Sequence, residues 1–305
     1  MNKNNGVYGM GWLHDLPDYR DYTVNTDVVS EKKLELGQKK SIKDMLAKIG
    51  VFKALKAGGE TSKDLRAWCS PIEDQGALGS CTAQAAAGLL EYYERRAFGK
   101  HIDCSRLFLY KVTRNLLGWT GDTGAYLRST MGAMVLFGAP PEKYWAYTIS
   151  TFDEEPSAFV YALGQNYQAV SYYRLDPPGT APTNLLNTIK ANLRMGLPSM
   201  FGFTVYDSIY QANTSGAIPF PFSGDSVIGG HAVVAVGFDD AKEIRHTAAN
   251  AAPTIGALLI RNSWGTGWGE GGYGWLPYEY VLRGLAVDWW SLLRNEWVET
   301  GQFGH

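Results

Sequence analysis

Residues 75–86, with the sequence QGALGSCTAQAA, decide the fold of this 305-residue chain. Cys81 follows a Gly-Ser pair and begins a helical pattern over residues 81–97, with apolar side chains at Ala83, Ala86, Ala87, Leu90 and Tyr93. A thiol at a helix N-terminus lies near unpaired N–H groups, which favour the thiolate and lower a pKa that is about 8.5 in free cysteine. Cys81 is therefore a candidate nucleophile. The alternative is a buried structural cysteine, the commonest fate of a single cysteine.

Two later motifs supply a candidate base and a group that could orient it. His231 begins the strand-like run HAVVAVGF, directly after two glycines. Asn262 ends an apolar strand pattern over residues 258–261 and precedes the run SWGTGWG. A cysteine, a histidine and an asparagine in this chain order can meet in space and perform nucleophilic catalysis, although they lie far apart in the sequence.

The blocks QGALGSC, GGHAVVAVGF and IRNSWGTGWGEGGYG together resemble the three signature blocks of papain-like (C1) cysteine peptidases. The resemblance covers residues 66–298, and three blocks in the right order are far more specific than any one of them. Leu78 stands where the secreted enzymes usually carry a disulfide cysteine, and Thr82 stands where they usually carry an aromatic residue. In these details the chain is more similar to microbial members of the family than to the plant and lysosomal enzymes.

The resemblance implies a cysteine endopeptidase that hydrolyses polypeptides through a Cys thioester, with no cofactor and no metal. Cys81 would be the nucleophile, and His231 would be the base that pairs with it and later protonates the leaving amine. Asn262 would orient the imidazole, while Gln75 and the backbone N–H of Cys81 would stabilise the oxyanion. Trp264 would cover the His–Asn contact; a plain core aromatic is the structural alternative, and both can hold.

Substrate-binding residues are also implied by the resemblance. Thr123 and Gly124, in a glycine-dense turn, would pair with the substrate backbone, and a plain helix-entry turn is the alternative. Gly230 and Ala232 would line an apolar pocket for the second residue before the cut. The far wall of that pocket would come from the region around Trp289 and Trp290.

The order of patterns predicts an α+β protein with a papain-like two-lobed fold and the cleft between the lobes. We expect an N-terminal extension over residues 1–65, a mainly helical lobe with the nucleophile over 66–168, a β-rich lobe with His and Asn over 169–298, and a tail over 299–305. In the helical lobe, helices are expected at 81–97, 105–112 and 126–137. In the β-rich lobe, strands are expected at 170–174, 199–205 and 231–238, a helix at 184–195, and an exposed loop at 239–256.

The N-terminal extension contains a second strong helix pattern, over residues 41–58. Ser41 and Asp44 form a capping box, an apolar face runs from Ile42 to Phe52, and two glycines end the pattern. We interpret this helix as part of an inhibitory pro-segment or cap, which would make the protein a zymogen. A structural extension and a basic helix on a membrane or partner are the alternatives.

Composition excludes several classes of function. The net charge of −2 predicts no nucleic-acid partner, and no apolar run approaches the ~20 residues of a membrane helix. The N-terminus lacks the apolar core of a secretory signal, so we expect cytoplasmic synthesis, with signal-independent export left open. We expect a monomer. Cys69 and Cys104 are either bridged or reduced, and the Cys and His residues lack the spacing of zinc ligands.

Two other functions remain open from the sequence. A catalytically silent relative could use the same cleft to bind peptides, although Gln75, Cys81, His231 and Asn262 are all present. An acyl transferase could pass the same thioester to an amine instead of water.

Overall fold

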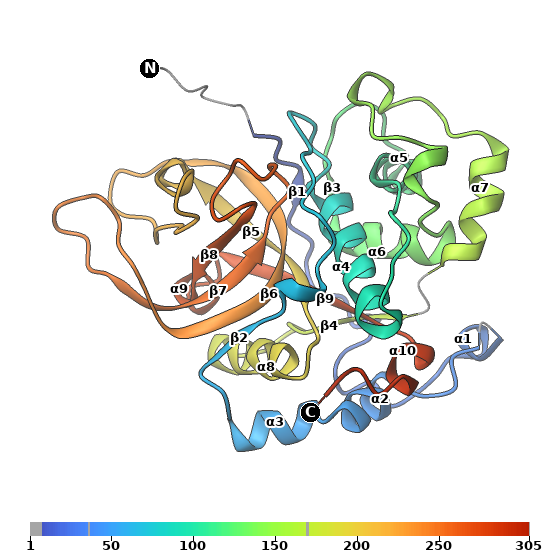
Figure 1. The fold of residues 1–305 in the computed structure, drawn as a ribbon, viewed down its shortest axis with the longest axis horizontal. Helices are drawn as coiled ribbons and strands as arrows, with labels where there is room; N and C mark the ends of the chain where they lie inside the picture. Colours follow the sequence, from blue (N-terminus) through green and yellow to red (C-terminus); the bar gives the residue numbers. More distant parts are fainter. Residues whose placement is uncertain (1–7, 36, 169–170, 305) are drawn as a thin grey trace.

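The computed structural model describes residues 8–35, 37–168 and 171–304. A helical lobe and a β-rich lobe lie side by side, and the N-terminal segment passes between them (Figure 1). This arrangement confirms the predicted α+β, two-lobed fold. The short strand β1 (Trp12–Leu13) lies at the junction and pairs in parallel with β3 (Ala125–Tyr126) of the helical lobe.

The helical lobe is built around α4 (Cys81–Phe98), in which nearly every side chain of the first three turns is buried. The other helices of this lobe are α5 (Arg106–Leu117), α6 (Leu127–Leu136) and α7 (Ala158–Gly164). Ser105 caps α5 by accepting the backbone N–H of Phe108, and Gly99 ends α4 in the left-handed conformation. α4 also packs on the sheet of the other lobe, so its first residue lies at the junction.

The β-rich lobe is a seven-stranded sheet in which every pair of neighbouring strands is antiparallel. Its strands, in sheet order, are β4 (Ser171–Arg174), β9 (Ala286–Leu293), β5 (Ser199–Tyr206), β6 (Val227–Ile244), β7 (Thr254–Arg261) and β8 (Tyr273–Pro277), with β2 (Ser62–Asp64) on β6. The helices α8 (Pro182–Arg194) and α9 (Tyr278–Leu282) belong to this lobe. Short 3₁₀ helices occupy Arg66–Trp68, Glu142–Tyr144, Ile149–Thr151, Gln165–Tyr167 and Asp207–Ala212.

Two expected boundaries differ from the structure. Half of the expected loop over residues 239–256 is strand, because β6 continues to Ile244 and β7 begins at Thr254, and the polar residues that follow Phe238 concealed the end of β6. β2 lies before the expected lobe boundary at residue 66, yet it hydrogen-bonds to β6 and is part of the sheet. The start of β4 is only described from Ser171, so expected residue 170 lies outside the described residues.

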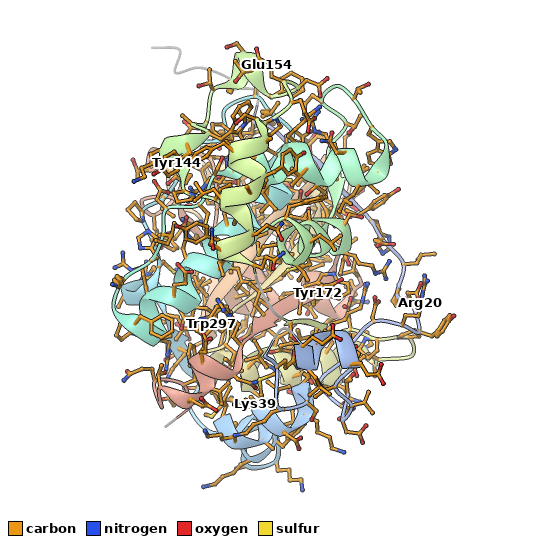
Figure 2. All side chains as sticks on the ribbon, turned by 90° about the vertical axis from the view of Figure 1, so that its right-hand side faces the viewer. Arg20, Lys39, Tyr144, Glu154, Tyr172 and Trp297 are labelled. Atoms are coloured by element: carbon orange, nitrogen blue, oxygen red, sulfur yellow. The ribbon has the colours of Figure 1, made fainter. Side chains whose placement is uncertain are left out.

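The helix expected over residues 41–58 is two helices, α2 (Ile42–Ile49) and α3 (Val51–Ala57). Gly50 separates them with a φ of 101°, a left-handed conformation that a helix interior cannot contain. These helices pack against α8 and against α10 (Asn295–Glu299), at the end of the molecule opposite the loop that carries Glu154 (Figure 2). They do not cover Cys81. The remaining helix of the N-terminal region is α1 (Glu31–Glu35).

All three cysteines are free thiols. The thiol of Cys69 donates to the carbonyl of Leu65 and that of Cys104 to the carbonyl of Ile102, so the structure contains no bridge between them. Among the described residues, no helix has both the length and the apolar composition that crossing a bilayer requires.

A buried ion pair stabilises the helical lobe. Arg106 donates to both carboxylate oxygens of Glu91, at 3.0 and 2.9 Å, and both side chains are almost fully buried. Removing one member of such a pair leaves a buried charge without its partner. We expect Arg106→Met to lower the free energy of unfolding by about 3–5 kcal/mol in urea denaturation. The matched control Arg66→Met breaks an exposed pair with Asp64 and should cost about 1 kcal/mol or less; equal losses would contradict the prediction.

Candidate active site

Cys81 is the first residue of α4 and is completely buried at the junction of the lobes. Its sulfur accepts a hydrogen bond from the backbone N–H of Gly11, at 3.3 Å. The sequence predicted a lowered thiol pKa. In the structure burial raises the pKa of Cys81 to about 11, although the backbone N–H groups around the sulfur act in the opposite direction. The difference arises because the N-terminal segment covers the sulfur and excludes water.

His231 and Asn262 are hydrogen-bonded to each other, and the backbone N–H of Ala232, the residue after His231, acts on the Cys81 sulfur. His231 faces the junction from β6, and its Nε2 lies 2.7 Å from Oδ1 of Asn262, just after β7. An amide oxygen can only accept, so Nε2 donates and a neutral ring keeps its lone pair on Nδ1. Nδ1 is buried and has no hydrogen-bond partner within the described residues. Burial lowers the pKa of His231 to about 4, and the bond to Asn262 only partly offsets this.

Trp264 covers the His231–Asn262 contact. Its indole stacks on the imidazole with ring centroids 4.4 Å apart and an interplanar angle of 21°. Phe203 of β5 packs edge-on against the same imidazole. Two aromatic groups therefore contact the imidazole and help to exclude water from it.

Gln75 is fixed between the two lobes. Its Nε2 donates to the carbonyl of Leu78 at 2.8 Å and to the carbonyl of Gly9 at 3.0 Å, and its Oε1 accepts the hydroxyl of Ser263 at 2.6 Å. The side chain is fully buried, so its amide is preorganised as a donor. A carbonyl oxygen of the chain itself already occupies the site toward which this donor points.

Residues 8–13 lie across Cys81, and the sequence did not predict this placement. The N–H of Gly9 bonds to the carbonyl of Gly76, and the carbonyl of Gly11 accepts the N–H of Ala125 at 2.8 Å. A Cβ on Gly9 or Gly11 would overlap the backbone of Leu78 or Gly79 respectively. The two glycines of the run Gly-Met-Gly-Trp were the available signal, because glycine permits such close approach of backbones.

The four expected substrate-binding residues differ in burial and in their contacts with the N-terminal segment and Cys81. Gly124 is buried against the carbonyl of Gly11, and a Cβ on Gly230 would come within 2.6 Å of the Trp12 carbonyl. Ala232 is buried, and its backbone N–H acts on the Cys81 sulfur. Thr123 is exposed, and its hydroxyl donates to the carbonyl of Gly124. The backbone of β3, immediately after this turn, pairs with β1 of the N-terminal segment. Among the described residues, no three His, Cys, Asp or Glu side chains are placed to hold a metal ion.

The raised thiol pKa has a measurable consequence in the full-length chain. A pKa of about 11 leaves on the order of one Cys81 thiol in ten thousand ionised at pH 7, and the thiolate is the reactive form. We expect the rate of Cys81 alkylation by iodoacetamide to rise continuously from neutral pH toward pH ~11. Peptide mapping by mass spectrometry separates Cys81 from Cys69 and Cys104. A rate that is already maximal below pH 7 would contradict this expectation.

Comparisons with known proteins agree with this geometry. Residues 60–281 match the family described as papain family cysteine protease. The chain belongs to the papain family of cysteine proteases. An uncharacterized peptidase C1-like protein of Acanthamoeba polyphaga mimivirus is 32% identical to it, over 92% of this chain and 86% of the viral protein.

Solved structures of papain-family proteases share the fold. Xylellain, a cysteine protease from Xylella fastidiosa, is 30% identical, with a TM-score of 0.70 over 96% of this chain and all of that chain. The bromelain protease from Ananas comosus, solved with the E64 inhibitor, is 18% identical, with a TM-score of 0.57 over 77% of this chain, which shows the fold alone. The resemblance read from the three motifs, including its similarity to microbial members, is confirmed. This papain-family protein is a cysteine peptidase that acts on polypeptides.

Proposed function

We propose that this peptidase is an endopeptidase that is synthesised with its cleft blocked by residues 8–13. The observation that most directly supports this proposal is the hydrogen bond from the N–H of Gly11 to the sulfur of Cys81. The segment presents the N–H of Gly11 to the nucleophile, while the carbonyl of Gly9 accepts the proposed oxyanion donor Gln75 and the carbonyl of Gly11 accepts Ala125. Since attack requires a carbonyl carbon at the sulfur, and the group that faces the sulfur is an N–H, the segment occupies the site without being a substrate.

Displacing the segment would change the protonation equilibria of Cys81 and His231. Water would then reach Cys81 and His231, and the desolvation that keeps both neutral would weaken. Cys81 could transfer its proton to His231, attack the peptide carbonyl and form a thioester, with His231 protonating the leaving amine. Gln75 and the backbone N–H of Cys81 would stabilise the oxyanion in the place where Gly9 now binds. Water would then hydrolyse the thioester.

Residues outside the cleft anchor the proposed blocking segment. Arg128 of α6 pairs with Asp15 and with Asp21, the latter at 2.8 Å. Tyr8 stacks on Trp264 with centroids 4.3 Å apart. The segment is thus held on both sides of Cys81, which supports inhibition by the chain's own N-terminal region. The inhibitory role belongs to residues 8–13, while α2 and α3 serve as a structural extension.

The test is hydrolysis of fluorescent casein by the full-length protein carrying Gly9→Ala and Gly11→Ala, hereafter the open variant. We expect the open variant to hydrolyse casein and the same protein with Cys81→Ala to be inactive. Product masses in the presence of an added amine separate hydrolysis from acyl transfer. Binding of casein without cleavage, in a folded open variant, would instead support the silent peptide-binding function.

A further inference from the structure

The side chain of Trp12 fills a pocket beside Cys81. It is 8% exposed, and it lies over Gly202 of β5 and Gly230 of β6. A Cβ on Gly202 would overlap the indole ring, and a Cβ on Gly230 would come within 2.8 Å of its Cε3 atom. The absence of side chains at these two glycines, on neighbouring strands, leaves a slot that holds the indole ring.

The far wall of this slot is Asp288. Its Oδ2 accepts the indole N–H of Trp12 at 3.1 Å, and its side chain is completely buried. The pairing of β5 with β9 shifts between Met200 and Gly202, so that a bulge forms at Asp288. Asp288 adopts a φ of 63° there, which a bulge uses to redirect a side chain. Asp288 lies in the region around Trp289 and Trp290 from which this wall was expected, while Trp289 itself stacks on Phe201 in the core.

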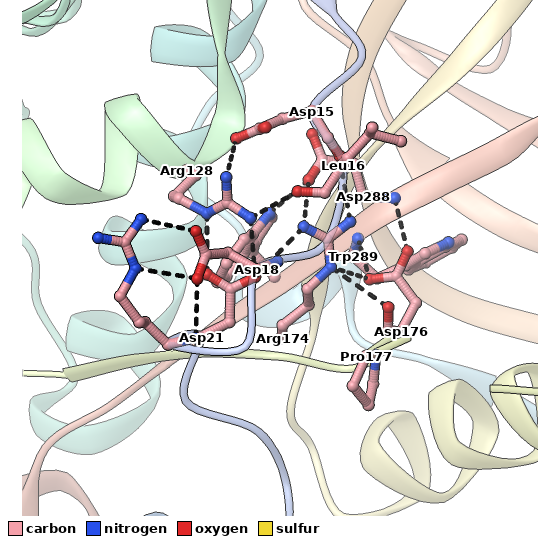
Figure 3. A network of polar contacts seen from close by, with 12 residues as sticks. Asp15, Leu16, Asp18, Asp21, Arg128, Arg174, Asp176, Pro177, Asp288 and Trp289 are labelled. Atoms are coloured by element: carbon pink, nitrogen blue, oxygen red, sulfur yellow. Dashed lines mark hydrogen bonds and ion pairs between the residues drawn. The ribbon is translucent and has the colours of Figure 1, made fainter. Parts of the chain in front are cut away.

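Other groups hold this carboxylate in one orientation. Asp176 accepts the backbone N–H groups of Asp288 and Trp289, at 2.8 and 3.0 Å, and so secures the bulge (Figure 3). The indole N–H of Trp290 donates to Oδ1 of Asp288 at 2.7 Å. These bonds leave Oδ2 directed into the slot as a preorganised acceptor.

The charge around Asp288 is already balanced by the body of the protein. Arg174, which is 1% exposed, lies 3.3 Å from Oδ1 of Asp288 and 2.9 Å from Asp176 (Figure 3). Asp15 and Asp21 enter the same network with the N-terminal segment, where Arg128 pairs with both. Displacement of residues 8–21 as a whole leaves Arg128 and Arg174 with Asp176 and Asp288, so positive and negative charges are then equal in number. A cationic substrate side chain would add an uncompensated buried charge, whereas a neutral N–H donor would not.

We propose that Asp288, Gly202 and Gly230 form a specificity pocket that selects substrates with tryptophan as the second residue before the cut. This inference rests on the proposed function, because it takes the site held by Trp12 as a substrate site in the open enzyme. The slot accepts a flat ring, and Oδ2 of Asp288 accepts a hydrogen bond from an N–H group at the edge of that ring. A phenylalanine side chain fills the slot but cannot donate this hydrogen bond. An arginine side chain adds an uncompensated positive charge to the buried network.

The test compares matched peptides that differ only at this residue, using the open variant at about pH 7.5. Burial raises the pKa of Asp288 to about 6, so the carboxylate is ionised there. 3-Benzothienylalanine has the shape of tryptophan with sulfur in place of the N–H. We expect kcat/KM for tryptophan to exceed that for benzothienylalanine by about 10- to 100-fold, the usual effect of a hydrogen bond to a charged group. Equal values, or a preference for arginine, would overturn the proposal.

Two variants of the open enzyme give independent readouts. Asp288→Gly permits the positive φ and leaves Arg174 paired with Asp176, and it should make the two peptides equal. Gly202→Ala shortens the slot and should shift preference from tryptophan to valine. Gly132→Ala is the matched control, because a Cβ there meets open space, and it should leave the preference unchanged. A tryptophan preference that survives Gly202→Ala would overturn the proposal.

Measuring peptide binding in the absence of hydrolysis tests the specificity pocket independently of the proposed peptidase function. Calorimetry measures the Kd of the same peptides for the open variant with Cys81→Ala, where no hydrolysis occurs. A tighter Kd for tryptophan with no peptidase activity in the parent open variant would support the pocket and overturn the proposed function. Hydrolysis with equal Kd values for tryptophan and benzothienylalanine would overturn the pocket alone.

Discussion

The open variant, with Gly9→Ala and Gly11→Ala, should react with an epoxide thiol inactivator at Cys81 at least about 100 times faster than the unmodified full-length chain. Each new methyl group would overlap the backbone of the loop at Leu78 and Gly79, which cannot retreat because Asp122 holds the N–H of Gly79. An overlap of this kind costs a few kcal/mol, and about 2.7 kcal/mol corresponds to the stated factor. Intact mass against time measures the rate.

The control for this experiment is Gly132→Ala, which introduces the same methyl group into α6 in open space. It should label at the rate of the unmodified chain. Equal rates for the open variant and the unmodified chain, with both folded, would show that residues 8–13 do not restrict access to Cys81. Peptide mapping must assign the adduct to Cys81, because Cys69 and Cys104 are also free thiols.

Gln75→Ala in the open variant should lower kcat by about 10²–10³-fold, the typical cost of losing one oxyanion donor. The Nε2 group of Gln75 points at the carbonyl of Gly9, which stands in the place proposed for the reacting carbonyl. KM should change little, since the donor acts mainly on charge that develops in the transition state. Steady-state hydrolysis of a peptide substrate measures both constants.

Ser263→Ala tests whether such a loss is merely structural. The hydroxyl of Ser263 donates to Oε1 of Gln75, so this variant loosens the glutamine but keeps its N–H donor. We expect it to lower kcat by less than about 10-fold. If both variants lose activity equally, Gln75 acts by joining the lobes and not by stabilising the oxyanion.

Most of the fold could be predicted from local sequence patterns. The helix beginning at Cys81 and the strand containing His231 follow from apolar periodicity, which depends on neighbouring residues alone. The break at Gly50 and the strand residues after Phe238 were missed for a related reason. A glycine can either continue or end a helix, and the end of an interior strand can carry exposed polar side chains, so only the packing around them decides.

The active site likewise has features that the sequence indicated and features that depend on tertiary structure. Cys81, His231, Asn262 and Gln75 could be proposed from motifs, because papain-like peptidases carry those residue types in that chain order. The thiol pKa could not be predicted. A helix N-terminus lowers it and burial raises it, and the burial comes from a segment 70 residues away in the sequence.

The sequence by itself determined the family, the two-lobed α+β fold and the candidates for the reacting residues, since these depend on short motifs and local periodicity. Only the tertiary structure decided what lies in the cleft. Gly11 at the Cys81 sulfur and Trp12 against Asp288 bring together three distant parts of the chain, at residues 11–12, 81 and 288. Their relation depends on the β9 bulge and on contacts between the lobes, which leave no periodic pattern in the sequence.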